Sequence, residues 1–250
     1  MDDAALVVLP VILAAVRVTV FLVIAPPFNH RAIPATVKAM LGVGLALALA
    51  SSMTVPVEVT AATLIAMALS EAVTGAGLGV LVSLIFSAVQ SAGRLIDMLG
   101  GFELGQALDP MTMTNSGPFG RFYQLIAVVL LFVSDGYQLV VGGLARSFDA
   151  LPLGAMLDLG ALAGQLAEGV SQLFLAAIQV AGPLIAVLFL ADVGLGLLTR
   201  VAPALNAFAL GFPLKILITL TLGSVTLAAL PGVVDWLADQ AIRGIGEVVR

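Results

Sequence analysis

Residues 125–133 read LIAVVLLFV and place apolar side chains on every side of the element that they form. A strand of a membrane barrel instead alternates apolar and polar residues over about 10 positions. The stretch therefore predicts a helix in apolar surroundings. The wider run Tyr123–Ala145 is long enough to cross a bilayer, since a spanning helix needs about 20 apolar residues.

The composition extends this conclusion to the whole chain. Of its 250 residues 61% are hydrophobic and 10% are charged, against roughly 25% charged residues in a soluble domain. This balance excludes a soluble globular enzyme. The net charge is −5 and no basic run occurs, which excludes nucleic acid as a partner. With no cysteine and one histidine, the chain has neither a disulfide framework nor a zinc or cofactor signature.

Other apolar segments are long enough to span a membrane, namely Ala4–Phe28, Ala72–Gly93, Val170–Ala191 and Leu214–Val234. Three further apolar stretches fit a span less well: 39–50 is uninterrupted but short, 53–69 contains Pro56 and Glu58, and 201–212 contains Pro203. The first two suit a helical hairpin or one long broken helix, and the third suits a half-length helix packed against protein. We expect an all-α membrane protein with about six hydrophobic segments and no β-sheet. No long polar linker divides it, so residues 1–250 are expected to form one domain.

Four charged residues lie within or beside apolar segments: Arg17, Glu58, Asp135 and Lys215. A charge facing lipid costs at least about 2.5–3.5 kcal/mol, so each must face protein, water or another charge. A structural ion pair or snorkelling of the side chain to the membrane interface would explain them, as would a polar path or contacts with partner subunits. For Asp135 a polar path or a contact with a partner subunit is favoured, because its neighbours in the sequence offer no cation. For Lys215 both remain open.

Glycines four residues apart occur at Gly75/Gly79, Gly101/Gly105 and Gly160/Gly164. On a helix, this spacing places two small residues on one face and lets another backbone approach closely. The pairs predict either packing within the chain or an interface with another subunit.

The segment Arg94–Phe122 combines an amphipathic helical pattern with a long loop. Its second part, 109–120, carries two prolines, two glycines and no charge after Asp109. Loops of this length are usually functional or disordered, and its Met and Phe content favours an ordered loop. Methionine makes pliable apolar contacts, which suit a seal.

No catalytic signature is present, so an enzyme is not expected. Pro26-Pro27-Phe28-Asn29 and Pro203-Ala204-Leu205-Asn206 form a weak internal repeat, such as transporters carry. A small-solute secondary transporter is therefore an alternative. The broken segments lack the paired carboxylates that ion coupling usually needs.

Nearly the whole chain resembles the family of the flagellar biosynthetic protein FliR, with relatives in virulence type III secretion. The resemblance lies in Arg17 with Pro26-Pro27-Phe28, Pro34 and Lys38, in Glu71 with Gly75 and Gly79, in Gly93-x-x-x-Asp97 followed by Asp109-Pro110, and in Arg200-x-x-Pro203-x-x-Asn206-x-Phe208-x-x-Gly211-x-Pro213-x-Lys215. The last string is the most specific.

The resemblance implies a subunit of the flagellar protein-export gate, a multi-pass protein of the bacterial inner membrane within the basal body. The subunit would be built from bent helical hairpins, and its function would be translocation of unfolded export substrates, not catalysis. Its partners would be FliP-like and FliQ-like membrane subunits, an FlhB-like export protein and membrane lipid. An injectisome gate subunit is the alternative with the same fold.

The resemblance also implies site residues. A central loop in the family contributes to a plug that closes the pore, and here that loop maps onto Asp109, Pro110, Met111, Met113, Phe119 and Phe122. Assembly and packing are expected to involve Arg17, Glu71, Gly75, Gly79, Asp135, Pro203, Asn206, Gly211, Pro213 and Lys215.

Overall fold

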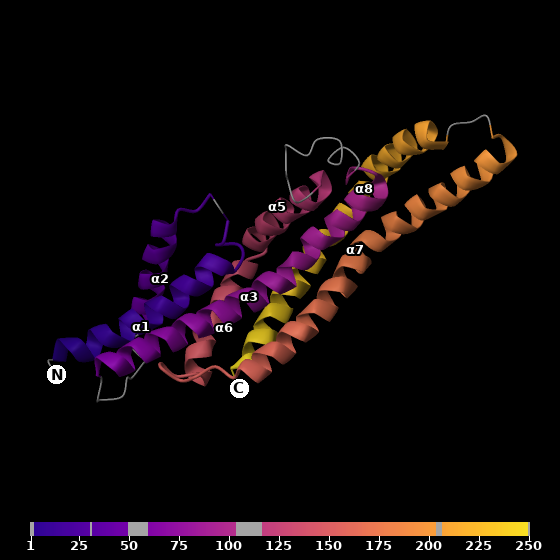
Figure 1. Ribbon diagram of the computed structural model, residues 1–250. Coiled ribbons are helices and arrows are strands. Elements are labelled where there is room, and N and C mark those ends of the chain that lie inside the picture. Colours follow the sequence, from indigo (N-terminus) through magenta and orange to yellow (C-terminus); the bar gives the residue numbers. More distant parts are fainter. Residues whose placement is uncertain (1–2, 31, 50–59, 104–116, 204–206, 250) are drawn as a thin grey trace. The chain divides into compact units, whose positions relative to one another are not determined.

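The computed structural model describes residues 3–30, 32–49, 60–103, 117–203 and 207–249. Within these ranges the chain forms helices and no strand, which confirms the all-α prediction (Figure 1). The helices are α1 (Asp3–Ile24), α2 (Ala35–Leu49), α3 (Ala61–Gly100), α5 (Pro118–Val133), α6 (Gly136–Ala150), α7 (Leu159–Val201) and α8 (Ala207–Val248).

Three of these helices, α3, α7 and α8, are long and apolar enough to cross a membrane. They contain the predicted segments Ala72–Gly93, Val170–Ala191 and Leu214–Val234. The chain is therefore an all-helical membrane protein. The helix α1 confirms the predicted N-terminal helix but ends at Ile24, and its described apolar part is shorter than the other three.

The predicted span Tyr123–Ala145 is not one straight helix. It is divided between α5 and α6, which are bent by 75° at a break after Val133. Asp135 adopts the left-handed conformation at this break, with φ 57° and ψ 13°. Aspartate tolerates that conformation better than most residues, and Ser134 and Gly136 beside it also favour a turn. These three residues end the helix despite the apolar residues around them.

The helix α3 joins segments that the sequence suggested were separate. It continues from Ala61 through the predicted amphipathic region to Gly100. Gly101 then takes φ 84°, and the N–H of Phe102 donates to the carbonyl oxygen of Asp97 over 2.9 Å. This is the hydrogen bond of a Schellman helix end. Gly101 thus lies beyond the helix. The prediction that it shares a helix face with Gly105 was wrong for Gly101, and Gly105 lies outside the described residues.

Prolines lie at several helix ends, where their fixed φ and missing N–H are tolerated. Pro34 precedes α2, Pro118 begins α5, and Pro152 follows α6. Pro213 is different, because it lies inside α8 and not at a boundary. The predicted stub 201–212 is correspondingly divided between the end of α7 and the start of α8.

Contacts divide the chain into two compact units. The first comprises Met1–Ile85, Leu131–Val170 and Leu237–Arg250, and the second comprises Phe86–Leu130 and Ser171–Trp236. The expectation of one domain stays a prediction. Each unit contains buried apolar side chains: Leu13, Phe21, Leu78 and Leu144 in the first, and Ile96, Leu184, Leu188 and Leu230 in the second.

Candidate functional site

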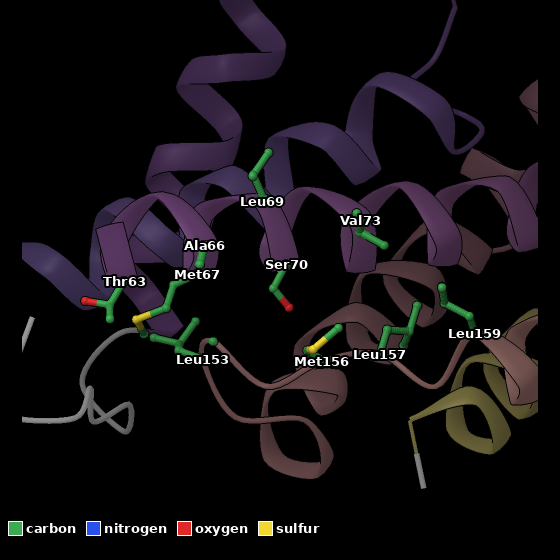
Figure 2. Close-up of a pocket in the computed structure, with 11 residues that line it drawn as sticks. Thr63, Ala66, Met67, Leu69, Ser70, Val73, Leu153, Met156, Leu157 and Leu159 are labelled. Carbon is green, nitrogen blue, oxygen red and sulfur yellow. The ribbon is translucent and has the colours of Figure 1, made fainter. Parts of the chain in front are cut away.

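An open groove of about 680 Å³ lies in the first unit, between the start of α3 and the segment 153–159 (Figure 2). Its lining is mainly apolar, and Figure 2 shows Met67 and Leu153 near one end and Leu159 near the other. Such a groove can accept an apolar chain. Sequence reasoning missed it, because the segment 153–159 carries no motif that predicts its position against α3.

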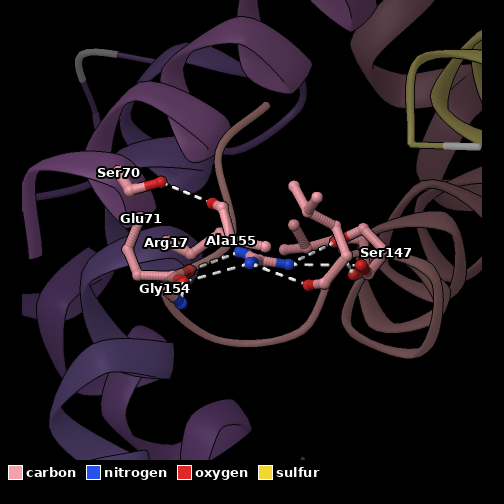
Figure 3. Close-up of polar contacts among 8 residues, drawn as sticks. Arg17, Ser70, Glu71, Ser147, Gly154 and Ala155 are labelled. Atoms are coloured by element: carbon pink, nitrogen blue, oxygen red, sulfur yellow. Dashed lines mark hydrogen bonds and ion pairs between the residues drawn. The ribbon is translucent and has the colours of Figure 1, made fainter. Parts of the chain in front are cut away.

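Hydrogen bonds hold this segment in place (Figure 3). Ser70 Oγ donates to the carbonyl oxygen of Ala155 over 2.5 Å, and the N–H of Gly154 donates to Glu71 Oε1 over 2.7 Å. Gly154 has φ 80°, a conformation that favours glycine. One wall of the groove is therefore fixed to α3 by polar contacts.

The carboxylate of Glu71 belongs to a buried cluster around Arg17. Both side chains have no exposed surface, and Arg17 Nε donates to Glu71 Oε2 over 2.6 Å while Nη2 donates to Oε1 over 3.2 Å. The guanidinium also lies over the ring of Phe148, 4.2 Å from its centroid. The ion pair with Glu71 is thus one of several contacts that compensate the buried charge of Arg17.

The remaining donors of Arg17 are satisfied by backbone and hydroxyl oxygens. Nη1 reaches the carbonyl oxygen of Ser147 at 3.2 Å and its Oγ at 3.3 Å, and Nη2 reaches the carbonyl oxygen of Leu151 at 3.1 Å. A buried ion pair is stable only when such additional hydrogen bonds are made. The cluster joins α1, α3, α6 and the segment that follows α6.

Gly75 and Gly79 allow α3 to approach α1. A Cβ atom at Gly75 would lie 2.3 Å from the carbonyl oxygen of Arg17, and one at Gly79 would lie 3.0 Å from Cβ of Ile24. Any larger residue at Gly75 must move the backbone of α1. This pair therefore serves packing within the chain, which is one of the two functions that its spacing predicts.

In the second unit, Asp97 of α3 binds the beginning of α5. The N–H of Phe119 donates to Asp97 Oδ1 over 2.9 Å, and the N–H of Gly120 donates to Oδ2 over 2.7 Å. One turn earlier, a Cβ atom at Gly93 would lie 2.6 Å from the carbonyl oxygen of Phe119. The motif Gly93-x-x-x-Asp97 thus combines a close approach with an acceptor for two free N–H groups.

The same aspartate also contacts residues on either side of 104–116. Its carbonyl oxygen accepts the N–H of Phe102, as described above. A Cβ atom at Gly117 would lie 2.3 Å from Asp97 Cγ, so Gly117 packs directly against the carboxylate. The rings of Phe102 and Phe119 are 5.2 Å apart.

The predicted plug residues fall into two groups. Asp109, Pro110, Met111 and Met113 lie outside the described residues. Phe119 and Phe122 lie on the first turns of α5 and not in a loop.

The two aromatic residues on α5 have different surroundings. Phe119 packs against Phe102 and lies 6.3 Å from Tyr123, whose hydroxyl is hydrogen-bonded to Thr226. Phe122 is 46% exposed. Phe122 is therefore the more accessible of the two.

The other predicted residues lie in several places. Asp135 is exposed at the break between α5 and α6, and it accepts a hydrogen bond from Gln138 Nε2 over 2.9 Å. The sequence suggested that Asp135 lies inside an apolar helix, and this prediction was wrong. Gly211 is in α8, where its Cβ would lie 3.1 Å from Leu195, and Pro203 lies just after α7. Asn206 lies outside the described residues.

Lys215 forms an ion pair within the second unit. Its Nζ lies 2.8 Å from Oδ1 of Asp192, which is on α7. The ion pair with Asp192 thus accounts for the charge of Lys215 within the chain. Sequence reasoning missed Asp192, although an acid on one helix and a base on the next, 23 positions later, is the kind of signal that could have revealed the pair. Over the described ranges, no group of three His, Cys, Asp or Glu side chains is placed to hold a metal ion.

Comparison with known proteins decides the family. Residues 8–241 match the family described as "Bacterial export proteins, family 1". The chain belongs to this family. It is 33% identical to the flagellar biosynthetic protein FliR of Pectobacterium carotovorum over 94% of this chain and 88% of the relative. It is 30% identical to FliR of Bacillus subtilis over 83% of this chain and 82% of the relative.

A relative from a different secretion apparatus matches a smaller part of the chain. The secretion system apparatus protein SsaT of Salmonella typhimurium is 34% identical over 61% of this chain and 60% of the relative. The chain is thus similar both to proteins named for flagellar biosynthesis and to a protein named for a secretion system.

Proposed function

We infer that the chain is a membrane subunit of the flagellar type III protein export gate in the bacterial inner membrane. The observation that carries this conclusion is the similarity to FliR proteins, which extends over as much as 94% of the chain. The three long apolar helices agree with it, since a gate subunit resides in the membrane. The chain contributes to translocation and is not an enzyme.

The alternative is a gate subunit of a virulence secretion system. SsaT supports it over 61% of the chain, whereas FliR proteins match over 83–94%. The flagellar assignment is therefore favoured.

Assembly with FliP-like, FliQ-like and FlhB-like proteins is the finer part of the proposal. It is supported by the large apolar side chains that α7 and α8 leave exposed. These surfaces need lipid or protein to cover them. On α7 they include Phe174, Ile178, Phe189 and Leu190, and on α8 they include Leu217 and Leu220.

The segment that contains Met111 and Met113 is proposed to close the channel against ions and unfolded export substrates. Its apolar side chains would exclude water from the closed pore. Phe122 would add to this function because it is exposed, whereas Phe119 would hold the start of α5 in place. The packing and assembly residues named above, among them Arg17 and Lys215, would keep the subunit in the shape that its partners bind.

Deletion of the gene in its own bacterium tests the assignment. We expect loss of flagella and of flagellar proteins from the culture medium, with both restored by the wild-type gene supplied on a plasmid. Normal flagella together with loss of a virulence secretion activity would favour the alternative. If neither changed, the export function would be wrong.

A further inference from the structure

Lys38 is a buried cation for which the described part of the chain provides no counterion. The chain has two lysines, and they differ in this respect. Lys215 pairs with Asp192 over 2.8 Å, whereas Lys38 is 7% exposed and none of the described residues pairs with it. No acid occurs in the sequence between Asp3 and Glu58, so neither the rest of α1 nor α2 supplies one. A buried charge is stable only when another group compensates it.

The ammonium group of Lys38 is the part of this side chain that another molecule can reach. Among the described polar side-chain atoms that are fully buried, only Thr74 Oγ1 lacks a hydrogen-bond partner. Lys38 Nζ, which makes no hydrogen bond to a described residue, is therefore not fully buried. A long side chain of this kind buries its methylene groups against protein and keeps its charged end open. The opening is small and leads to a positive charge, so it suits a compact anionic group.

Lys38 belongs to the narrow face with which α2 packs on α1. The buried residues of α2 are Lys38, Gly42 and Ala46, which are four positions apart. A Cβ atom at Gly42 would lie 2.1 Å from Thr19 Oγ1, so the two helices approach closely. Leu41 is three positions after Lys38 and thus its neighbour on the helix surface, and it is exposed. Apolar open surface therefore borders the ammonium group.

The other faces of α2 are apolar and uncovered. Its exposed large side chains are Val37, Met40, Leu41, Val43 and Leu47. The helix has 15 residues, fewer than the about 20 that cross a bilayer, so one of its ends lies within the apolar layer, where neighbouring protein must satisfy free backbone groups. At Gly44 a Cβ atom would meet nothing within 4 Å, which leaves room for a second helix to approach. A protein helix therefore fits this surface better than lipid alone.

We propose that α2 is a docking surface for a membrane-embedded helix of another export-gate subunit, and that a carboxylate of this helix pairs with Lys38. This inference rests on the function proposed above and names the chemistry of one partner contact. Apolar side chains of the partner cover Met40 and Leu47, while its acidic side chain reaches the ammonium group at the edge of α2. A carboxylate at the end of a side chain fits a narrow opening better than the phosphate of a lipid, which carries two ester groups.

Carbodiimide cross-linking of the wild-type complex tests this pairing. The reagent activates a carboxylate, a lysine amine in contact with it attacks the carbonyl carbon, the amide bond forms and the reagent leaves as a urea. Lys215 and Asp192 provide an internal control, because their cross-link is expected within this chain. We expect Lys38 to be joined to an Asp or Glu of a different gate subunit. Mass spectrometry of the digested complex identifies both cross-links.

Three variants measure what the pairing contributes. Lys38→Met removes the charge and leaves the partner's acid unpaired, so the chain should leave a complex immobilised through a partner subunit about tenfold faster or more. Lys38→Arg keeps the charge and should stay close to the wild type. Arg243→Met is the matched control, since it removes a cation at an exposed position of α8. Equal rates for Lys38→Met and Arg243→Met would show that Lys38 has no charge partner in another chain.

The group that is joined to Lys38 decides the inference, whether or not the variants fold. A cross-link to Glu58 of the same chain, or to a second copy of this chain, would overturn it. So would a complex in which Lys215 is joined to Asp192 and Lys38 to nothing, which is the result expected where water or a lipid phosphate faces the ammonium group. If the wild-type chain purifies without other gate proteins, the proposed export function fails instead.

Discussion

Arg17 and Glu71 are 54 residues apart in the sequence and are joined in the structure by a buried ion pair of 2.6 Å between Nε and Oε2. Their side chains have no exposed surface. Since Glu71 also accepts the N–H of Gly154, the pair connects α1 and α3 to the wall of the apolar groove. Loss of either partner would leave a buried charge without its counterion.

Glu71→Gln should therefore destabilise the chain. Breaking one partner of a buried pair costs about 3–5 kcal/mol. Thermal unfolding of the purified complex in detergent measures the effect, and Asp239→Asn, at an exposed position of α8, is the control. A similar unfolding temperature for both variants would contradict the structural importance of the pair.

Gly75→Ala should also destabilise the chain, because its Cβ would lie 2.3 Å from the carbonyl oxygen of Arg17. Overpacking of this kind costs roughly 1–3 kcal/mol. Gly142→Ala provides the comparison, since it adds the same methyl group into open space. The two variants are compared by the amount of folded chain recovered from membranes. Equal recovery would show that α1 and α3 do not pack as closely as described.

The pair of Asp192 and Lys215 predicts a charge-swap result. Lys215→Asp places two acids side by side, and the added change Asp192→Lys restores an ion pair of opposite direction. We expect the single variant to reduce assembly and the double variant to recover part of it. The measurement is the yield of intact complex from membranes. If the double variant yields no more complex than the single one, the 2.8 Å contact has no part in assembly.

Much of the fold follows from local patterns in the sequence. The cores of α3, α7 and α8 were predictable because a run of about 20 apolar residues is a strong local signal. The start of α5 at Pro118 was also predictable from a local signal, since proline suits the first turn of a helix. The break at Asp135 was missed although Ser134-Asp135-Gly136 is a turn-forming sequence, because the long apolar runs on both sides outweighed this three-residue signal.

The contacts of the site were less predictable. Arg17 and Glu71 were both singled out, but their pairing depends on how helices distant in the sequence pack. Asp97 was recognised only as part of a motif, since the N–H groups that it binds come from α5, more than 20 residues later. Sequence spacing describes single helices well, whereas these contacts arise between helices.

Deleting Met111–Ser116 tests the proposed closing function and leaves Gly117 in place against Asp97. A seal is not required for assembly, so the shortened chain should still join its partners. Under the proposed closing function the open state should gain population, because the seal that the deleted side chains are proposed to form exists only in the shut state. Growth and inner-membrane conductance are compared at equal amounts of complex. Unchanged conductance would make this segment a connector.

We propose that this chain is one subunit of a membrane export gate and does not act alone. The most direct measurement is affinity purification of the tagged full-length chain from the membranes of its own bacterium, followed by mass spectrometry and determination of the complex mass. We predict a stable complex that contains FliP-like and FliQ-like chains, and a poorly stable protein when the chain is expressed without them. A monodisperse, thermally stable monomer without such partners would contradict the account.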